Sequence, residues 1–215
     1  MEAIFNFLQA LQKHNNREWF QAHKVEFMQA QELFTELIEG LLAKVAAFDP
    51  QLKNLTAKDC IFRIYKDVRF SKDKHPYKTH FGASLSPGGK KTAVAGYYLH
   101  LDPGNSFFGG GLYQPDKDTL HRLRLAIQQS PGELLHILQD RHFKQYFGDL
   151  DQTEMLKTAP RGFDKNDPHI DLLRHKHFIA TAPLLSEAVL SDEKTLSNYV
   201  VNGYKAMYPL VHYLR

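Results

Sequence analysis

Positively charged side chains gather in one stretch of the chain, residues 61–82, which we call the basic segment. It carries six Lys or Arg and two Asp, a local balance of +4 in a chain of 215 residues whose formal net charge is +3. The cations are Arg63, Lys66, Arg69, Lys72, Lys74 and Lys78. Aromatic residues lie between these charges, which favours a segment held against a core over one that trails in solvent. Because a guanidinium matches the oxygens of phosphate or carboxylate and an ammonium adds point charge, the basic segment predicts an anion-binding site.

Seven residues of the basic segment are candidate ligands for that anion. They are Arg63, Lys66, Arg69, Ser71, Lys74, Tyr77 and Lys78. Arg161 is a further candidate, because it lies in a stiff Pro-Arg-Gly turn that can aim a guanidinium at an anion. We expect Arg161 to join the basic segment in space.

Acid–base chemistry would use the two carboxylates of the segment and a nearby histidine. Asp67 and Asp73 are surrounded by cations, which lower the pKa of a carboxyl group and suit it to act as a base or an orienting group. Together with His80 they are the candidate catalytic residues. The competing interpretation is structural: the two carboxylates pair with Arg69 and Lys74 to fix a loop, and the sequence favours neither interpretation.

Histidine spacing does not predict a metal site. Among the twelve His, His175 and His177 are two residues apart, and His100 stands two residues before Asp102. Such pairs share a face on a strand, but a zinc site normally needs three or four ligands, and neither an H-E-x-x-H motif nor a cysteine pair is present. We therefore assign no metal ligand, and the cofactor is unknown. Cys60 is the only cysteine, and its apolar neighbours predict a buried, unreactive thiol.

Hydrophobic periodicity predicts helices at both ends of the chain and strands in the middle. Helices are expected over 2–13, 17–47 with a bend near His23, 116–129, 131–138, 168–174 and from 191 onward, where Pro209 forces a bend or stop. Strands are expected over 61–65, 80–85, 94–101, 106–113, 154–158 and 177–181. Turn residues at 87–89 and 102–105 make the strands that they join antiparallel. The run Gly109–Gly111 is expected at a turn or bulge.

Composition limits the class of protein to which the chain can belong. With 43% hydrophobic residues the chain can bury a full core. We expect one α+β domain over residues 1–215, with a central antiparallel β-sheet built from hairpins and packed with N-terminal and C-terminal helices. Its helical region spans about 1–50, its sheet core about 55–113 and its mixed helix and strand part about 114–215.

A cytoplasmic protein without membrane contact is expected. The longest apolar runs are four or five residues, far below the roughly 20 needed to cross a bilayer. Met1 opens directly into an amphipathic segment that lacks the pattern of a signal peptide.

The basic segment resembles the signature of a known family. Residues 62–78 read F-R-I-Y-K-D-V-R-F-S-K-D-K-H-P-Y-K, and four further motifs fit in order. They begin at Asn15, Gly96, Gly109 and Pro160 and read N-N-R-E-W-F, G-Y-Y-L, G-G-G-L and P-R-G-F. Over nearly its whole length the chain is thus similar to the bacterial and fungal family called domain of unknown function 2461. Lys66 stands where Arg is commoner, and His75 where Thr is commoner. The resemblance implies a cytoplasmic single-domain protein and carries no established activity.

Two functional hypotheses follow. In the first, the basic segment forms a pocket on the sheet for a phosphorylated or carboxylated small molecule, and hydrolysis or group transfer is the reaction class to test. In the second, the protein is a non-enzymatic module that binds nucleic acid or another protein, with Tyr65, Phe70 or Tyr77 stacked on bases. The sequence decides neither whether the protein is an enzyme nor its oligomeric state.

Overall fold

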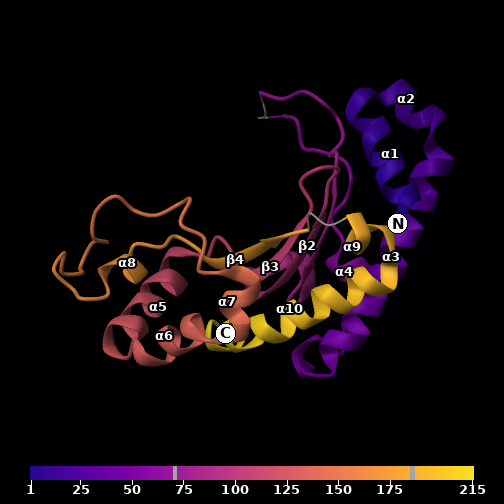
Figure 1. Cartoon of the computed structure of the whole chain (residues 1–215). Coiled ribbons are helices and arrows are strands. Elements are labelled where there is room, and N and C mark those ends of the chain that lie inside the picture. Colours follow the sequence, from indigo (N-terminus) through magenta and orange to yellow (C-terminus); the bar gives the residue numbers. More distant parts are fainter. Residues whose placement is uncertain (70–71, 185–186) are drawn as a thin grey trace.

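A four-stranded antiparallel sheet forms the centre of the molecule (Figure 1). This computed structural model describes residues 1–69, 72–184 and 187–215. The strands, in spatial and sequence order, are β1 (Phe81–Leu85), β2 (Gly96–Leu101), β3 (Phe107–Leu112) and β4 (Phe178–Pro183). Each pairs antiparallel with the next, so the predicted α+β class and its antiparallel hairpins are confirmed.

The N-terminal part is helical, with a break where the sequence predicts one. It contains α1 (Glu2–Lys13), α2 (Arg17–Ala22), α3 (Lys24–Ala46), the 3-10 turn η1 (Pro50–Leu52) and α4 (Ala57–Cys60). His23 separates α2 from α3, and its ring stacks on Trp19 with the ring centroids 4.1 Å apart. Asn16 caps α2, because its side chain accepts a hydrogen bond from the backbone of Trp19. Cys60 is buried, as predicted, and burial raises the pKa of its thiol to about 11.

The remaining helices follow the third strand. They are α5 (Lys117–Gln129), α6 (Gly132–Gln139), α7 (Arg141–Phe147), α8 (Ile170–Leu173), α9 (Glu187–Ser191) and α10 (Glu193–Tyr213), and the short 3-10 turn η2 (Gly89–Lys91) lies between the first two strands. Asp116 and Asp192 cap α5 and α10 through their side chains. The predicted stop at Pro209 is wrong, because α10 continues past this residue to Tyr213. Pro209 is exposed near the end of the helix, where its ring displaces no core side chain.

The two faces of the sheet differ in character. Alternate residues such as Phe81, Leu99 and Phe108 are buried, and α10 packs on this face over β3. The opposite face carries Tyr98, His100 and Phe107 with glycines beside them. The core therefore lies on one side of the sheet, and the polar side chains of Tyr98 and His100 lie on the other.

Three predictions about strands are wrong. Residues 61–65 form only two isolated bridges, Ile61 with Ala83 and Tyr65 with Tyr77, so this segment is extended without being a strand. Residues 154–158 likewise contribute a single bridge, Met155 with His175. The glycine run lies inside β3 and not at a turn, since all three glycines pair with both β2 and β4. A Cβ on Gly109 would stand 2.3 Å from the carbonyl oxygen of Ala180, so the strands pack closely there.

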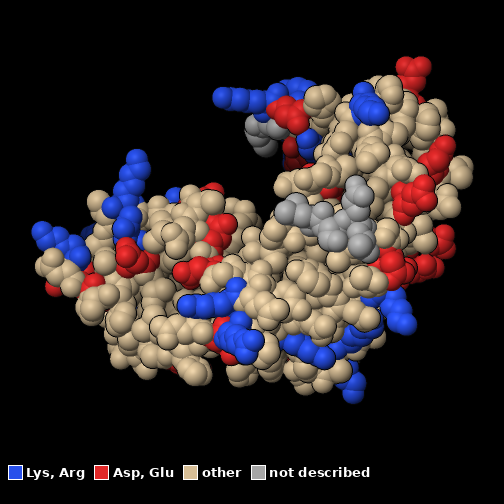
Figure 2. All heavy atoms as spheres, in the orientation of Figure 1, with Lys and Arg blue, Asp and Glu red and all other residues tan. Residues whose placement is uncertain are grey.

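The molecule has a hollow between two projecting parts (Figure 2). One part consists of α1, α2 and the basic segment. The other consists of α5, α8 and the chain between 148 and 177 (Figure 1). Within the described ranges, no helix combines the length and apolar character that crossing a membrane requires.

Candidate functional site

The basic segment runs outward from the β1 edge of the sheet. The backbone amide of Phe62 donates to the carbonyl of Gly82 at 2.9 Å, which ties the base of the segment to β1. Further out, the amide of Lys78 donates to Ile64 at 2.8 Å, and that of Lys66 donates to Pro76 at 2.9 Å. The two arms of the segment thus pair with each other, and the described residues 67–69 and 72–75 lie in the projecting tip.

Two contacts fasten this projection to the N-terminal helices. The side-chain amide of Asn15 donates to the carbonyl of Tyr77 at 2.9 Å and accepts from the amide of Tyr77 at 3.1 Å. The Tyr77 ring is only 2% exposed and stacks on Phe20 with the ring centroids 3.9 Å apart. Burial also raises the pKa of the Tyr77 hydroxyl. The structure therefore places Tyr77, a predicted ligand, in the core that anchors the segment.

Ion pairs within the tip involve both predicted catalytic carboxylates. Arg69 donates to Asp67 through two nitrogens, at 2.6 and 2.9 Å. Asp73 accepts from the Lys66 ammonium at 2.7 Å and lies 2.6 Å from Nδ1 of His75. These hydrogen bonds, from Arg69 to Asp67 and from Lys66 to Asp73, hold the pKa of each carboxyl below its usual range. The loop-fixing network that the sequence suggested is present, with Lys66 in the place expected for Lys74.

The other candidate ligands lie in different surroundings. Arg63 is exposed, and its charge helps to keep the pKa of Asp67 low. Lys74 donates to the carbonyl of Val68 at 3.2 Å. Lys78 is half-buried with its ammonium 5.3 Å from the centroid of the Phe62 ring, and burial lowers its pKa. Ser71 falls outside the described residues.

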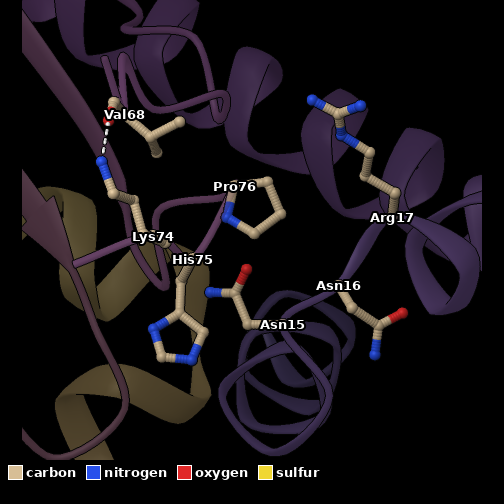
Figure 3. Close-up of a pocket in the computed structure, with 7 residues that line it drawn as sticks. All are labelled: Asn15, Asn16, Arg17, Val68, Lys74, His75 and Pro76. Carbon is tan, nitrogen blue, oxygen red and sulfur yellow. Dashed lines mark hydrogen bonds between the residues drawn. The ribbon is translucent and has the colours of Figure 1, made fainter. Parts of the chain in front are cut away.

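A pocket of about 460 Å³ lies between the tip and the start of α2 (Figure 3). It is lined by Asn15, Asn16, Arg17, Val68, Lys74, His75 and Pro76. Arg17 and Lys74 lie on opposite sides of Pro76 in this view, with the amide of Asn15 between the helix and the segment. Among the described residues that line the pocket, none is acidic. Two of its lining residues, Arg17 and Lys74, are cations.

The structure does not bring Arg161 to the basic segment. Arg161 belongs to the chain that flanks β4, where the amide of Asp151 donates to Ile179 at 2.8 Å and Phe163 contacts the ring of His121 in α5. The basic segment extends from β1, at the other edge of the sheet. Three strand spacings separate the two edges, about 14 Å.

His80 is also separated from the carboxylates proposed to act with it. It lies at the base of the segment, just before β1, whereas Asp67 is at the tip. Four to five extended residues separate the two positions, a distance of about 15 Å. Its ring instead faces His100, with centroids 4.2 Å apart. Burial is the main cause that lowers the pKa of His80 to about 4. His80 therefore lies beside His100 and not beside Asp67, with which it is predicted to act.

Arg17 and Asn16 are pocket residues that the sequence reasoning missed. Both belong to the N-N-R-E-W-F motif, which enters the sequence analysis only as one of the family motifs and not as part of a binding site. The sequence of a polar motif next to a helix cap does not show which distant residues it will contact in the fold. Only its place among the family motifs pointed to Asn16 and Arg17.

Comparison with known proteins finds a match to one family model. A family model described as conserved hypothetical protein (DUF2461) matches residues 3–213. No curated protein and no solved structure matches the chain.

Proposed function

We propose that this chain, which belongs to the conserved hypothetical protein family DUF2461, binds a phosphorylated or carboxylated small molecule in the pocket between α2 and the basic segment. The observation that carries the proposal is the lining of the pocket, which contains Arg17 and Lys74 and no described acidic residue. A volume of about 460 Å³ lies within the range of small-molecule sites. This proposal moves the site from the sheet face to the junction of helix and segment.

Each part of the pocket has a role in this proposal. Arg17 offers a planar fork for two oxygens of the anion, and Lys74 adds a point charge. Asp67 and Asp73 hold the tip in shape through their ion pairs with Arg69 and Lys66. In this proposal they orient the loop and do not bind the ligand themselves. Hydrolysis or group transfer on the bound ligand is the activity to assay once a ligand is known.

The test is a thermal-shift screen of the protein against phosphate, sulfate, nucleotides, sugar phosphates and dicarboxylates. A ligand at about 100 times its Kd stabilises the fold by about 2.7 kcal/mol, which raises the Tm of a chain of this size by roughly 5 to 10 °C. We expect Arg17→Ala and Lys74→Ala each to weaken binding by about 10-fold to 100-fold, the equivalent of one hydrogen bond to a charged group. Lys13→Ala is the matched control, because Lys13 is exposed close to this junction but outside the pocket.

Two results would contradict the proposal. One is the absence of a shift from every anion in the screen. The other is a shift that survives unchanged in folded Arg17→Ala and Lys74→Ala.

Nucleic-acid binding is the second candidate, because the exposed ring of Tyr65, 42% accessible, lies in the basic segment where a base can stack. Salt separates the two candidates. Binding to a nucleic-acid backbone loses affinity linearly in log salt with a slope set by the number of phosphates engaged, whereas a ligand with one or two charges responds weakly. A short oligonucleotide that binds with a steep slope, and loses its affinity in Tyr65→Ala, would favour this second candidate.

A further inference from the structure

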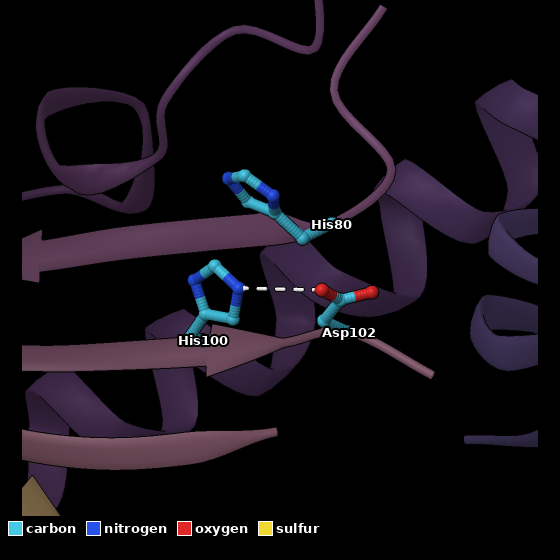
Figure 4. A group of neighbouring side chains, drawn as sticks. All are labelled: His80, His100 and Asp102. Atoms are coloured by element: carbon cyan, nitrogen blue, oxygen red, sulfur yellow. Dashed lines mark ion pairs between the residues drawn. The ribbon is translucent and has the colours of Figure 1, made fainter. Parts of the chain in front are cut away.

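Three side chains that could hold a metal ion converge at the ends of β1 and β2 (Figure 4). His80 immediately precedes β1, His100 lies in β2 and Asp102 directly follows β2. One potential ligand atom from each lies within 4.8 Å of the others. Across the described part of the chain, this is the one group of three such residues. It adds His80 to the pair of His100 and Asp102, which by itself has too few ligands for a zinc site.

The spacing within the group suits an ion better than a direct bond. Nε2 of His100 and Oδ2 of Asp102 are 3.9 Å apart, too far for a hydrogen bond. Ligand atoms at about 2.1 Å from a tetrahedral zinc ion stand about 3.4 Å from one another. Side-chain rotations would have to bring the three atoms closer to bind one ion, and Figure 4 shows the His80 ring above the His100 ring with the Asp102 carboxylate to one side.

A second layer of contacts orients two of the three ligands. The Tyr98 hydroxyl lies 2.9 Å from Nδ1 of His100, which directs Nε2 toward Asp102. Nε2 of Gln12 donates to Oδ1 of Asp102 at 2.9 Å, which leaves Oδ2 facing His100. Partners of this kind fix the tautomer and orientation of metal ligands.

Gly82 allows the Tyr98 contact. Gly82 pairs with His100 across the sheet, and a Cβ on Gly82 would stand 2.6 Å from the Tyr98 hydroxyl oxygen. The hydroxyl lies over this glycine and reaches His100 from there. A strand position without a side chain thus supports the orientation of a candidate ligand.

Of the charges around the group, one favours a bound cation and one opposes it. His100 is buried and His80 is half-buried, and an imidazole binds an ion through the lone pair of a neutral ring nitrogen. The positive charge of Lys78 also acts on both rings and is unfavourable for a cation. Its ammonium lies over the Phe62 ring, and the Asp102 carboxylate supplies the compensating negative charge.

We propose that His80, His100 and Asp102 bind a divalent transition-metal ion. Two imidazoles and one carboxylate are a donor set for Zn²⁺ or Fe²⁺, and three protein ligands leave a coordination position open for water or another small ligand. The proposal does not depend on the anion pocket, whose lining residues differ from these three.

The competing explanation is a packing role. His100 also stacks on Phe107 with centroids 4.6 Å apart, so two neutral histidines could simply fill the edge of the sheet. That explanation predicts no stoichiometric binding of metal. It also predicts no effect of Asp102→Asn on metal affinity.

The test is a titration of the full chain, stripped of metal with EDTA and transferred to chelator-free buffer. Zn²⁺, anaerobic Fe²⁺ and Mn²⁺ are titrated calorimetrically, and Co²⁺ is followed by its visible absorption as a reporter of coordination. We expect one equivalent of Zn²⁺ or Fe²⁺ per chain. Tyr98→Phe, which removes an orienting contact, weakens binding by about 10-fold to 100-fold, and His80→Asn and Asp102→Asn weaken it at least as much.

His75→Asn is the matched control, because His75 is an exposed histidine of the same segment outside the group. Circular dichroism and urea unfolding in EDTA establish that each variant is folded. His80→Asn and Asp102→Asn are made separately, so if one of them does not fold, the other still tests the proposal. Less than one equivalent bound by the wild type, or unaltered affinity in a folded ligand variant, would overturn the proposal.

Discussion

At the scale of single residues, His175 shows how burial makes stability depend on pH. It is 4% exposed and its ring lies 5.6 Å from that of Phe178. Burial lowers the pKa of His175 below the ordinary 6.5, and nearby Asp149, Asp151 and Asp171 oppose this shift only in part. The folded protein therefore holds this ring neutral under conditions in which the unfolded chain protonates it.

The sign of the pH effect follows from that difference. Well above pH 6.5 the ring is neutral in both states and contributes no pH dependence. As the pH falls below 6.5, the unfolded chain takes up the proton first, so the free energy of unfolding falls until the folded pKa is reached, by at most about 1.4 kcal/mol per pH unit for one group. We predict that His175→Gln flattens this part of the profile, measured by urea unfolding in EDTA between pH 7 and pH 5. An equal slope in variant and wild type would contradict the assignment to His175.

At the scale of elements, two glycines inside helices have opposite surroundings. Gly203 lies in α10, where a Cβ would stand 2.3 Å from the Phe108 ring of β3. Gly40 lies in α3 with nothing within 4 Å of a Cβ. The first glycine permits the close approach of helix and sheet, and the second only weakens its helix.

The same substitution should therefore have opposite effects at the two positions. We predict that Gly40→Ala raises the free energy of unfolding by about 0.4 to 1 kcal/mol, because it reduces the conformational entropy of the unfolded chain. Gly203→Ala should lower it by about 1 to 3 kcal/mol, because the added methyl overpacks the contact with Phe108. Denaturant unfolding of the two variants checks this. Stabilisation by Gly203→Ala would show that the contact between α10 and β3 is looser than described, and destabilisation by Gly40→Ala would contradict the open surroundings of that glycine.

At the scale of the whole molecule, one buried ion pair joins distant parts of the chain. Arg215, after α10, donates to both oxygens of Asp49, after α3, at 2.8 Å each. The Tyr97 hydroxyl of β2 donates to the same carboxylate at 3.0 Å, and Arg215 also donates to the carbonyl of Ala95. Asp49 is 1% exposed, so this network connects two helices and the sheet away from water.

We predict that Asp49→Ala destabilises the protein by about 3 to 5 kcal/mol, because it leaves the Arg215 guanidinium buried without its partner. For a chain of this size that lowers the Tm by roughly 6 to 20 °C. Asp67→Ala is the matched control: it also removes a carboxylate paired with two nitrogens of an arginine, but on the exposed tip, where solvent screens the pair and little stability should be lost. Calorimetry compares the two, and an equal loss in both would show that burial does not set the strength of these pairs.

Sequence reasoning was reliable where the physical cause is local. The caps Asp116 and Asp192 bond to backbone amides two or three residues away, and the break at His23 follows a shift in the apolar stripe. The hairpin strands and their antiparallel pairing follow from alternation and turn residues over short distances. The basic segment was identified by composition, and its role in ligand binding stays a prediction.

The tertiary structure alone decided which distant groups meet. Residues 61–65 have strand-like alternation, with Ile64 buried and Arg63 exposed, yet form no strand, because ladder bonds need a partner that the fold supplies only at two points. Asn15 and Tyr77 are 62 positions apart in the chain, and Asp49 and Arg215 are 166 apart. The sequence by itself determined the class of the fold, the helix starts at Asp116 and Asp192 and the charged segment, since these depend on neighbouring residues. The anion pocket, the buried ion pair and the His80, His100 and Asp102 group depend on how whole elements pack, a sum of many weak contacts that no short pattern records.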